Sequence, residues 1–486
     1  MSKLSELLPA GSGAKSAEFV ASGTLASGQA VALKTDGTVT AISATGGDPV
    51  INTPAVFDTR DINRMWACYD TASSKVVVAY TELNVGNYGV AVVGYVSGNT
   101  ISFGTPVTFV SAFADNKAIV EDNGASGVVI AFQNRGNSAY GTAIVGAVSG
   151  MSISFGTAVV FSSANTSGFG AAYQSNNGKT VISYSVLSGN GKVIVGTVSG
   201  GTSISFGSPA TLPVEISYSA ATFDATADKI LVWYRDGTTS GRPGKVAVGT
   251  VSGTTISFIT PVTFEAGNTS FVYACYAKNI NKHIVVFTDA DNSDSTTVLV
   301  ASLSGSSLSF GTPVVIAGNS SKSYGIAYDA TSQKVLITYY FINNAVAGYF
   351  KVGTISGASI SFSAQQTLTS TAYAYHSASP VANHGTGAGI SFAVAYGAEV
   401  AGNNPGTGVV INPSSSNSPS FVGITDQVIA NTATGAVIVQ GGVNSKVTSL
   451  TIGSDYYVQS NGTLSTTVTA VPAGRALSTT SILLEG

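Results

Sequence analysis

Three aspartates in one segment have a spacing that could hold a cation. Asp289, Asp291 and Asp294 follow one another as D-x-D-x-x-D. Carboxylate oxygens at such intervals are the hard ligands that calcium takes. The pattern then departs from an EF-hand loop, because Asp294 stands at the sixth position, where that loop needs glycine, and no glutamate stands at the twelfth. Calcium binding and a solvated polar loop both remain open here, and no other cofactor is expected.

Histidines offer little support for a second metal centre. The chain has three, His283, His376 and His384. His376 and His384 could meet across a turn between two strands, but no neighbouring cysteine or carboxylate completes a ligand set. His283 begins an apolar strand, where we expect it at the surface.

Charged side chains gather in two other segments. Arg235, Asp236 and Arg242 lie in one and Arg135 in another. Glycosidases need a close pair of carboxylates, and carboxylates are sparse in these segments. The Ser-x-Asp-x-Gly-x-Thr-Trp box of sialidases is absent, and so is a nucleophile elbow. We therefore expect a protein that binds a ligand and is not an enzyme.

Aromatic residues accompany these charged residues. An aromatic ring can stack on the face of a sugar while polar groups bind its hydroxyls. The predicted ligand-binding residues are Tyr88, Arg135, Tyr140, Arg235, Asp236, Arg242, Tyr324 and Tyr375. The alternative is that the aromatic residues line the core or a central channel.

A stretch close to SISFGTPV recurs along the chain and must position these residues. Its phenylalanine returns every 51 or 52 residues. The copies are Phe103, Phe155, Phe206, Phe258, Phe310 and Phe362. Each interval holds four strand-like segments: a short first strand, a very apolar second strand, a third strand with Val-Gly-x-Val-Ser-Gly, and the motif as the fourth. A period near fifty residues with several strands per unit is typical of a propeller.

The repeats also predict how the array closes. The second strand occurs seven times, whereas the complete turn and fourth strand occur six times. Residues 49–57 align with the fourth strand and could supply the missing copy, so that strands from both ends of the array form one blade and no edge stays open. We predict an all-β chain with a seven-bladed β-propeller over residues 49–413. A β-helix is the alternative repeat architecture.

The segments outside the repeats form a second predicted domain. Residues 17–45 and 419–486 contain short strand-like runs with turns at Asp36-Gly37 and Asn461-Gly462. We predict one small split β module into which the propeller is inserted. Residues 1–16 are predicted to be an N-terminal arm, because Pro9 and the glycines after it break any helix that the preceding leucines begin.

The connections between strands are of two kinds. Short, similar turns join the first to the second strand and the third to the fourth, and their end of the ring is called the fixed face. Long, dissimilar loops join the second to the third strand at 81–88, 133–140, 235–242, 289–296 and 397–406. The crossings to the next repeat also vary and carry aromatic residues, including Tyr218 and Phe271. Loops whose only role is packing would not need to differ from repeat to repeat. The end of the ring that holds the long loops and the crossings is called the variable face, and it is predicted to bind the ligand. The module is predicted to lie at the fixed face.

Composition argues against several partners. Of the 486 residues, 44% are apolar and 9% are charged, the net charge is −3, and no run of lysine and arginine occurs. These values argue against nucleic acid and anionic lipid as partners. No apolar run approaches the roughly 20 residues that span a bilayer, and residues 1–9 lack a secretory apolar core, so neither membrane insertion nor this route of export is expected. Cys68 and Cys275 lie four repeats apart, too far for a disulfide.

The flanking segments resemble a module of tailed-bacteriophage structural proteins. The similar stretches are FVASGTLASGQAV at 19–31, GGVN at 441–444, GSDYYVQ at 453–459 and AGRALS at 473–478. The resemblance covers roughly the first 45 and the last 65 residues. It implies a virion component, tail-fibre-like or head-decoration-like, made in the host cytoplasm, which contacts other virion proteins and assembles as a homo-oligomer, often a trimer. It carries no binding residues over to the repeats.

These expectations lead to one functional hypothesis and two alternatives. The module attaches to the phage particle, and the propeller binds a host-surface glycan or protein receptor. The first alternative is a capsid or tail decoration that stabilises the particle without binding a receptor. The second is an enzyme that degrades envelope sugars.

Overall fold

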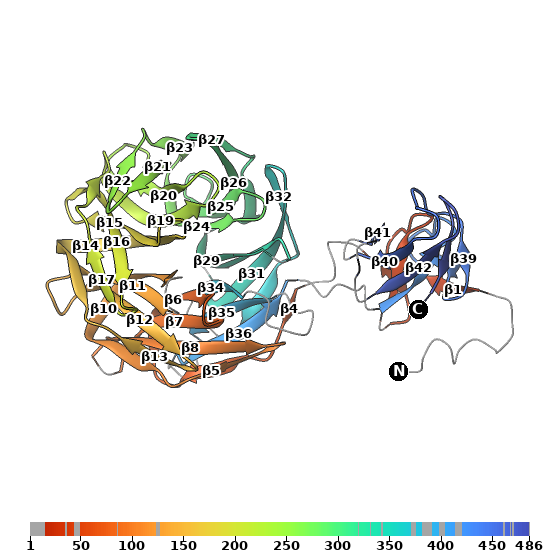
Figure 1. Cartoon of the computed structure of the whole chain (residues 1–486), viewed down its shortest axis with the longest axis horizontal. Coiled ribbons are helices and arrows are strands. Elements are labelled where there is room, and N and C mark those ends of the chain that lie inside the picture. Colours follow the sequence, from red (N-terminus) through yellow and green to blue (C-terminus); the bar gives the residue numbers. More distant parts are fainter. Residues whose placement is uncertain are drawn as a thin grey trace. The chain divides into compact units, whose positions relative to one another are not determined.

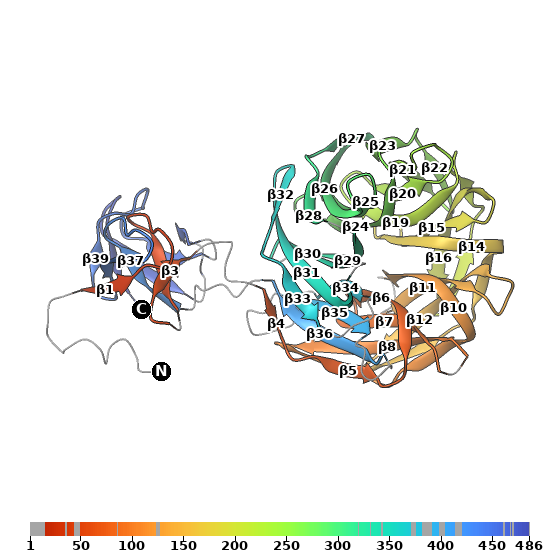
Figure 2. The same cartoon turned by 180° about the vertical axis from the view of Figure 1, so that it is seen from behind.

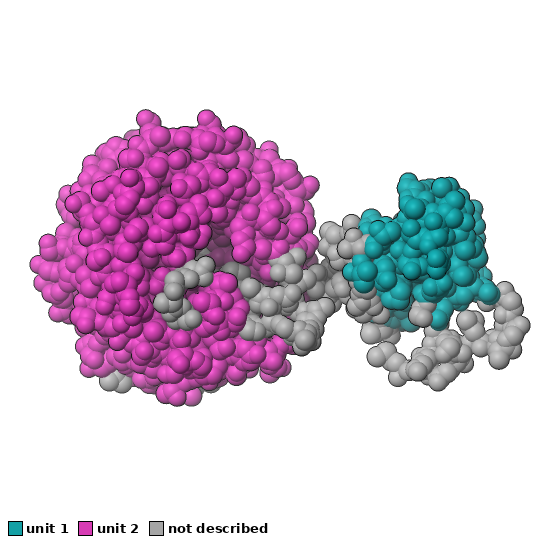
Figure 3. All heavy atoms as spheres, viewed as in Figure 1, with its two compact units in different colours: residues 1–48, 414–486 teal, residues 49–413 magenta. Residues whose placement is uncertain are grey.

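The computed structural model describes residues 15–34, 36–42, 49–84, 86–122, 127–318, 320–330, 332–341, 344–370, 376–381, 391–397, 404–413, 420–459, 462–466, 468 and 471–485. Two compact units are present: unit 1 holds residues 1–48 and 414–486, and unit 2 holds residues 49–413 (Figure 3). The described elements are all β-strands, which confirms the all-β prediction. Within this described part, no helix is long and apolar enough to cross a membrane.

Unit 2 consists of antiparallel strand groups that share one order (Figure 1). The first strands are β6 (Ile62–Asp70), β19 (Ile216–Asp224), β24 (Thr269–Ala277), β29 (Ser321–Asp329), β34 (His376–Val381) and the second halves of β10 (Val107–Asp122) and β14 (Val159–Gln174). The second strands are β7 (Lys75–Glu82), β11 (Gly127–Asn134), β15 (Lys179–Val186), β20 (Lys229–Asp236), β25 (Lys282–Asp289), β30 (Lys334–Phe341) and β35 (Ser391–Gly397). The third strands are β8 (Tyr88–Ser97), β12 (Tyr140–Ser149), β16 (Gly189–Ser199), β21 (Gly244–Ser252), β26 (Ser295–Ser304), β31 (Asn344–Ser356) and β36 (Gly406–Asn412).

The outer strand of each group comes in two pieces that both pair with the third strand. The first pieces are β9 (Thr100–Phe103), β13 (Ser152–Phe155), β17 (Ser203–Phe206), β22 (Thr255–Phe258), β27 (Ser307–Phe310), β32 (Ser359–Phe362) and β4 (Val50–Ile51). The second pieces are β18 (Ala210–Thr211), β23 (Val262–Glu265), β28 (Val314–Ala317), β33 (Gln366–Thr369), β5 (Ala55–Asp58) and the first halves of β10 and β14. Two strands therefore continue from the outside of one group to the inside of the next.

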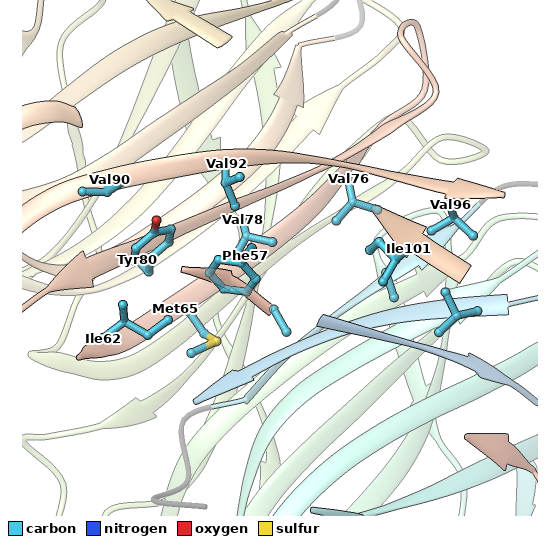
Figure 4. Close-up of a cluster of buried hydrophobic side chains, with 13 residues drawn as sticks. Phe57, Ile62, Met65, Val76, Val78, Tyr80, Val90, Val92, Val96 and Ile101 are labelled. Atoms are coloured by element: carbon cyan, nitrogen blue, oxygen red, sulfur yellow. The ribbon is translucent and has the colours of Figure 1, made fainter. Parts of the chain in front are cut away.

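The groups follow one another around a ring (Figures 1 and 2). Each first strand contacts the first strands of the groups before and after it, and β34 contacts β6. Strands from both ends of unit 2 share one group, because β4 and β5 pair with β36. Phe57 of β5 lies in one apolar cluster with Tyr80 of β7 and Val410 of β36 (Figure 4). This pairing covers the edge of β36, which would otherwise be open where the chain leaves the ring.

The core lies between the faces of neighbouring groups. Val77 and Val93 of one group share a cluster with Val128, Ile130 and Phe132 of the next. Because each sheet is covered on both faces, successive residues of its second strand are buried and show no alternation of buried and exposed positions, as in β7 and β11.

The repeated phenylalanine has a structural role. Gly94 of the third strand lies opposite Phe103, and a Cβ there would come within 2.8 Å of the phenyl ring. Phe103 also meets the ring of Phe57 from the preceding group at 5.1 Å. The Val-Gly-x-Val-Ser-Gly pattern therefore provides a bare stretch of backbone on which the phenyl ring lies. Its last glycine, such as Gly98 with φ +57°, makes the turn.

Unit 1 combines strands from both ends of the chain. One sheet has the order β1 (Ser16–Val20), β38 (Thr434–Ile438), β37 (Phe421–Thr425), β2 (Ala30–Leu33), β3 (Val39–Ala41). The other has the order β39 (Val443–Asn444), β43 (Ile482–Leu484), β42 (Pro472–Ala476), β40 (Asp455–Val458), β41 (Leu464–Ser465). Ala30 and Ile424 of the first sheet pack against Tyr456 and Ile482 of the second.

Candidate functional site

The long loops and the crossings lie at one end of the strand groups. Arg135 N, in a loop, donates to Phe113 O, in a crossing, at 3.0 Å. Equivalent bonds join Leu83 to Asp61 at 2.8 Å and Gly237 to Glu215 at 2.8 Å. The loops and crossings together therefore form the variable face.

Six of the seven described first strands begin with an irregular pairing at the variable face, whereas β34 pairs with β35 without a shift. Arg64, Gly168, Tyr218 and Phe271 occupy the same repeat position, and their φ angles are 50°, 57°, 49° and 50°. The register with the second strand shifts around each of them. Such bulges re-aim a side chain away from the regular alternation, and here all four residues line one central cavity.

The central cavity has a volume of about 400 Å³ and lies where the first strands converge at the variable face. Its lining includes Arg64, Trp66, Asp115, Lys117, Gly168, Phe169, Tyr218, Ser219, Phe271, Tyr273 and Lys322. A second cavity of about 150 Å³ shares Trp66 and Tyr273 with it and is otherwise lined mostly by glycine and alanine. The large side chains therefore lie at the opening, and the residues farther along the first strands are small.

Two arginines share one buried carboxylate at this opening. Asp115 forms ion pairs with Arg64 and, at 2.5 Å, with Arg135. Both guanidinium groups also lie over the ring of Phe113, at 5.5 and 4.9 Å from its centroid. Asp115 is fully buried, whereas both arginines remain partly exposed, so the arginines retain hydrogen-bonding groups that face solvent.

Lys117 is buried beside this cluster. Its Nζ donates to the carbonyl of Arg64 at 3.1 Å and to Thr81 Oγ1 at 2.5 Å, and lies 5.4 Å from the centroid of Trp66. Burial, together with the nearby charge of Arg64, lowers the pKa of Lys117 well below its ordinary value.

Four side chains form a continuous column on the other side of the opening. The Arg235 guanidinium lies 4.7 Å from the centroid of Tyr218, and the rings of Tyr218 and Phe271 are 4.8 Å apart. Lys322 Nζ lies 4.6 Å from the centroid of Phe271. Arg235 Nε also donates to Ser217 Oγ at 2.8 Å, which fixes the guanidinium over the ring. This arginine–tyrosine–phenylalanine–lysine column draws on three successive strand groups.

The predicted ligand-binding residues are distributed unevenly. Arg135 and Arg235 each contact a residue that lines the central cavity, Asp115 and Tyr218 respectively. Tyr88 packs against the apolar cluster between two groups, and Tyr140 is half-buried where β12 starts. Arg242 stays exposed in its loop. The side chain of Tyr324 and the whole of Tyr375 lie outside the described residues.

The prediction that Asp236 binds ligand is corrected by its surroundings. Its side chain is fully buried and accepts hydrogen bonds from the backbone amides of Thr238 and Thr239, from Thr239 Oγ1 and from Lys245 Nζ. Burial by itself would raise the pKa of Asp236, but the bonds from Lys245 and Thr239 lower it to about 2. The carboxylate therefore holds the loop in shape.

The structure gives the predicted calcium site no support, because the described residues contain no group of three or more histidine, cysteine or acidic side chains that could hold a metal. Asp289 accepts from the amide of Asn292 at 3.2 Å, whereas Asp291 accepts from the amide of Asn268 in the neighbouring crossing at 2.9 Å. The carboxylates bind separate backbone amides and do not converge. His376 and His384 cannot be assessed, because the side chain of the former and the whole of the latter lie outside the described residues.

The expected exposure of His283 is wrong as well. Its side chain is fully buried, with Nε2 3.2 Å from Asp224 Oδ2 and Nδ1 3.0 Å from Thr222 Oγ1. Burial lowers the pKa of His283, although Asp224 acts in the opposite direction. The second strand is covered on both faces, so its first residues are buried too.

Sequence reasoning did not single out Arg64, Lys117 or Lys322. A signal was available, because Arg64 stands at the same repeat position as the aromatic residues Tyr218 and Phe271. Lys117 and Lys322 each lie one position away from the equivalent residue of their own repeats. The useful signal was variation between repeats at the positions next to a regular strand.

Comparisons with known proteins find similarity in structure alone. No family model matches the sequence, and no curated protein matches it. The β-propeller domain of Cps50 (Swd1) from Myceliophteria thermophila has a TM-score of 0.47 and 10% identity, over 75% of this chain and 100% of that one. AofleA from Arthrobotrys oligospora has a TM-score of 0.41 and 9% identity, over 67% of this chain and 95% of that one.

Proposed function

We propose that this chain is a virion protein of a tailed bacteriophage that binds a host-surface glycan or protein receptor. In this proposal unit 2 is a seven-bladed β-propeller inserted into a split β module. The module, together with its N-terminal arm, binds other virion proteins. The chain assembles as a homotrimer. The observation that carries the proposal is the cationic and aromatic opening of the central cavity at the variable face.

The two ends of unit 2 lie at the fixed face. Asn412, at the end of β36, pairs with Val50 of β4, and its Nδ2 donates to Asn99 Oδ1 at 2.9 Å. Asn99 lies in a turn of the fixed face. The described chain therefore enters and leaves unit 2 at the fixed face, the end of the strand groups away from the opening of the central cavity.

The chemistry of the opening favours binding over hydrolysis. Asp115 is the one carboxylate in the described lining of the central cavity, and two arginines neutralise it. Glycoside hydrolysis uses two carboxyl groups in distinct protonation states. Stacked arginines and aromatic rings are typical of recognition sites.

The test is binding of the full-length protein to host cells, with a matched charge control. The double variant Arg135→Gln/Arg235→Gln removes two cations from the opening. The control Lys179→Gln/Lys282→Gln removes two cations from the fixed face, where their Nζ atoms bond to Thr197 and Ser302. We expect the first variant to lose cell binding at least tenfold while the control binds like the wild type.

Two results would contradict the proposal. Equal loss in both variants would mean that only net charge matters. No binding of the wild type to any host, combined with reduced particle stability when the gene is deleted, would support the decoration role.

A further inference from the structure

We propose that the column of Arg235, Tyr218, Phe271 and Lys322 is a subsite for an anionic saccharide. The sugar lies against the edges of the two rings, whose faces are covered by Arg235, by each other and by Lys322, and its carboxylate, sulfate or phosphate group pairs with the arginine or the lysine. This inference rests on the proposed function and names the ligand class of the same site.

The column differs from the Asp115 cluster in its charge balance. Asp115 forms ion pairs with both Arg64 and Arg135 and compensates one of their two charges, whereas no carboxylate among the described residues forms an ion pair with Arg235 or Lys322. The charge of Glu215 reaches Arg235, but the two groups are not within ion-pair distance. The column therefore presents two uncompensated cations in a chain whose net charge is −3.

Both cations are held in place before any ligand arrives. Arg235 is fixed by its hydrogen bond to Ser217 and by Tyr218, and it is half-buried. Lys322 lies over Phe271 and is half-buried as well. Pre-ordered side chains lose less entropy on binding, and partly desolvated cations gain more from an anion than fully hydrated ones do.

The two aromatic rings favour a saccharide over a free anion as the ligand. Tyr218 and Phe271 are half-buried, and both are held at the cavity by backbone with φ near +50°. Non-glycine residues adopt this conformation rarely, because the Cβ atom crowds the backbone there. A simple anion site would need only the cations, whereas the partly exposed edges of two adjacent aromatic rings supply apolar area beside a sugar ring.

A neutral saccharide fits the column less well. It would cover the two cations without supplying a counter-charge, and desolvating an unpaired charge is unfavourable. We therefore expect the column to select for the anionic group rather than for the sugar stereochemistry alone.

The test uses matched oligosaccharides with the full-length protein. The probes are oligogalacturonate, its carboxyl-reduced galactose oligomer and a sulfated galactose oligomer of the same length, measured by calorimetry at low and high salt. We expect at least tenfold tighter binding of the two anionic oligomers than of the neutral one, with the preference reduced by salt. A preference for one anion over the other identifies the group, and both results support the subsite.

Two variants separate the parts of the column. Arg235→Gln/Lys322→Gln should abolish the preference for anionic over neutral oligomers. Phe271→Ala should lower the affinity for all three oligomers. Lys179→Gln/Lys282→Gln should leave all three unchanged. Circular dichroism confirms that each variant is folded.

The failure of this inference is distinguishable from failure of the proposed function. Host-cell binding with equal affinity for neutral and anionic oligomers overturns the anionic subsite and leaves the receptor-binding role intact. Loss of anion preference in the fixed-face control overturns the assignment to this column. Absence of host-cell binding overturns the proposed function itself.

Discussion

Replacing Lys117 with methionine should change how stability depends on pH. The folded chain holds this lysine with a lowered pKa, so between that pKa and about 10.4, the value of an exposed lysine, the unfolded chain carries one proton more. Stability therefore rises with pH in this window and is lost as pH falls. One fully buried site contributes as much as about 1.4 kcal/mol per pH unit.

Methionine keeps most of the side-chain volume and removes the titrating group. It also leaves the carbonyl of Arg64 and the hydroxyl of Thr81 without the lysine as donor, at a cost of about 1 kcal/mol that does not vary with pH. Relative to the wild type, Lys117→Met should therefore gain stability as pH falls from about 10 toward the lowered pKa of Lys117, by at most about 1.4 kcal/mol per pH unit.

Urea unfolding at several pH values measures this difference. Trp66 lies beside Lys117 and Trp233 lies in another strand group, so coincident fluorescence and circular dichroism transitions would verify cooperative unfolding. Lys179→Met controls for the loss of a lysine at the fixed face. If Lys117→Met and the wild type keep a constant stability difference from pH 7 to pH 9, Lys117 is charged in the folded state and the reasoning fails.

Three further predictions follow from individual side chains. Phe310 is half-buried against an apolar cluster between two strand groups. Phe310→Ala should lower the free energy of unfolding by about 2–3 kcal/mol in urea titrations. A loss below about 0.5 kcal/mol would show that the repeated motif does not stabilise unit 2. Asp236, whose pKa is about 2, adds stability that is present above about pH 4 and is lost as pH falls toward 2. In Asp236→Asn the free energy of unfolding should therefore fall by about 1–2 kcal/mol less than in the wild type over this pH range. An unchanged pH dependence would refute this. Because Asp289 and Asp291 bind separate amides, millimolar calcium or a chelator should leave the melting temperature unchanged, and a calcium-dependent rise of several degrees would reinstate the site.

Much of the scaffold follows from local pattern. The interval between Phe103 and Phe155, the apolar second strands and the repeated turn glycines each require a particular backbone and burial, so strand positions could be predicted along the chain. The prediction of individual roles was weaker. Asp236 and His283 have the residue types of surface groups, yet both are buried, because a ring of two-sided sheets also covers the ends of its strands.

The sequence alone determined the period, the strand type and the contrast between uniform turns and dissimilar loops, because these depend on neighbouring residues. Only the tertiary structure decided which side chains meet. Arg64 reaches Asp115 from a different strand group, and Tyr218, Phe271 and Lys322 form one column although about fifty residues separate each from the next. The physical reason is ring closure: it brings equivalent positions of successive repeats together at one opening, where a left-handed backbone turn aims Arg64, Tyr218 and Phe271 into the same cavity.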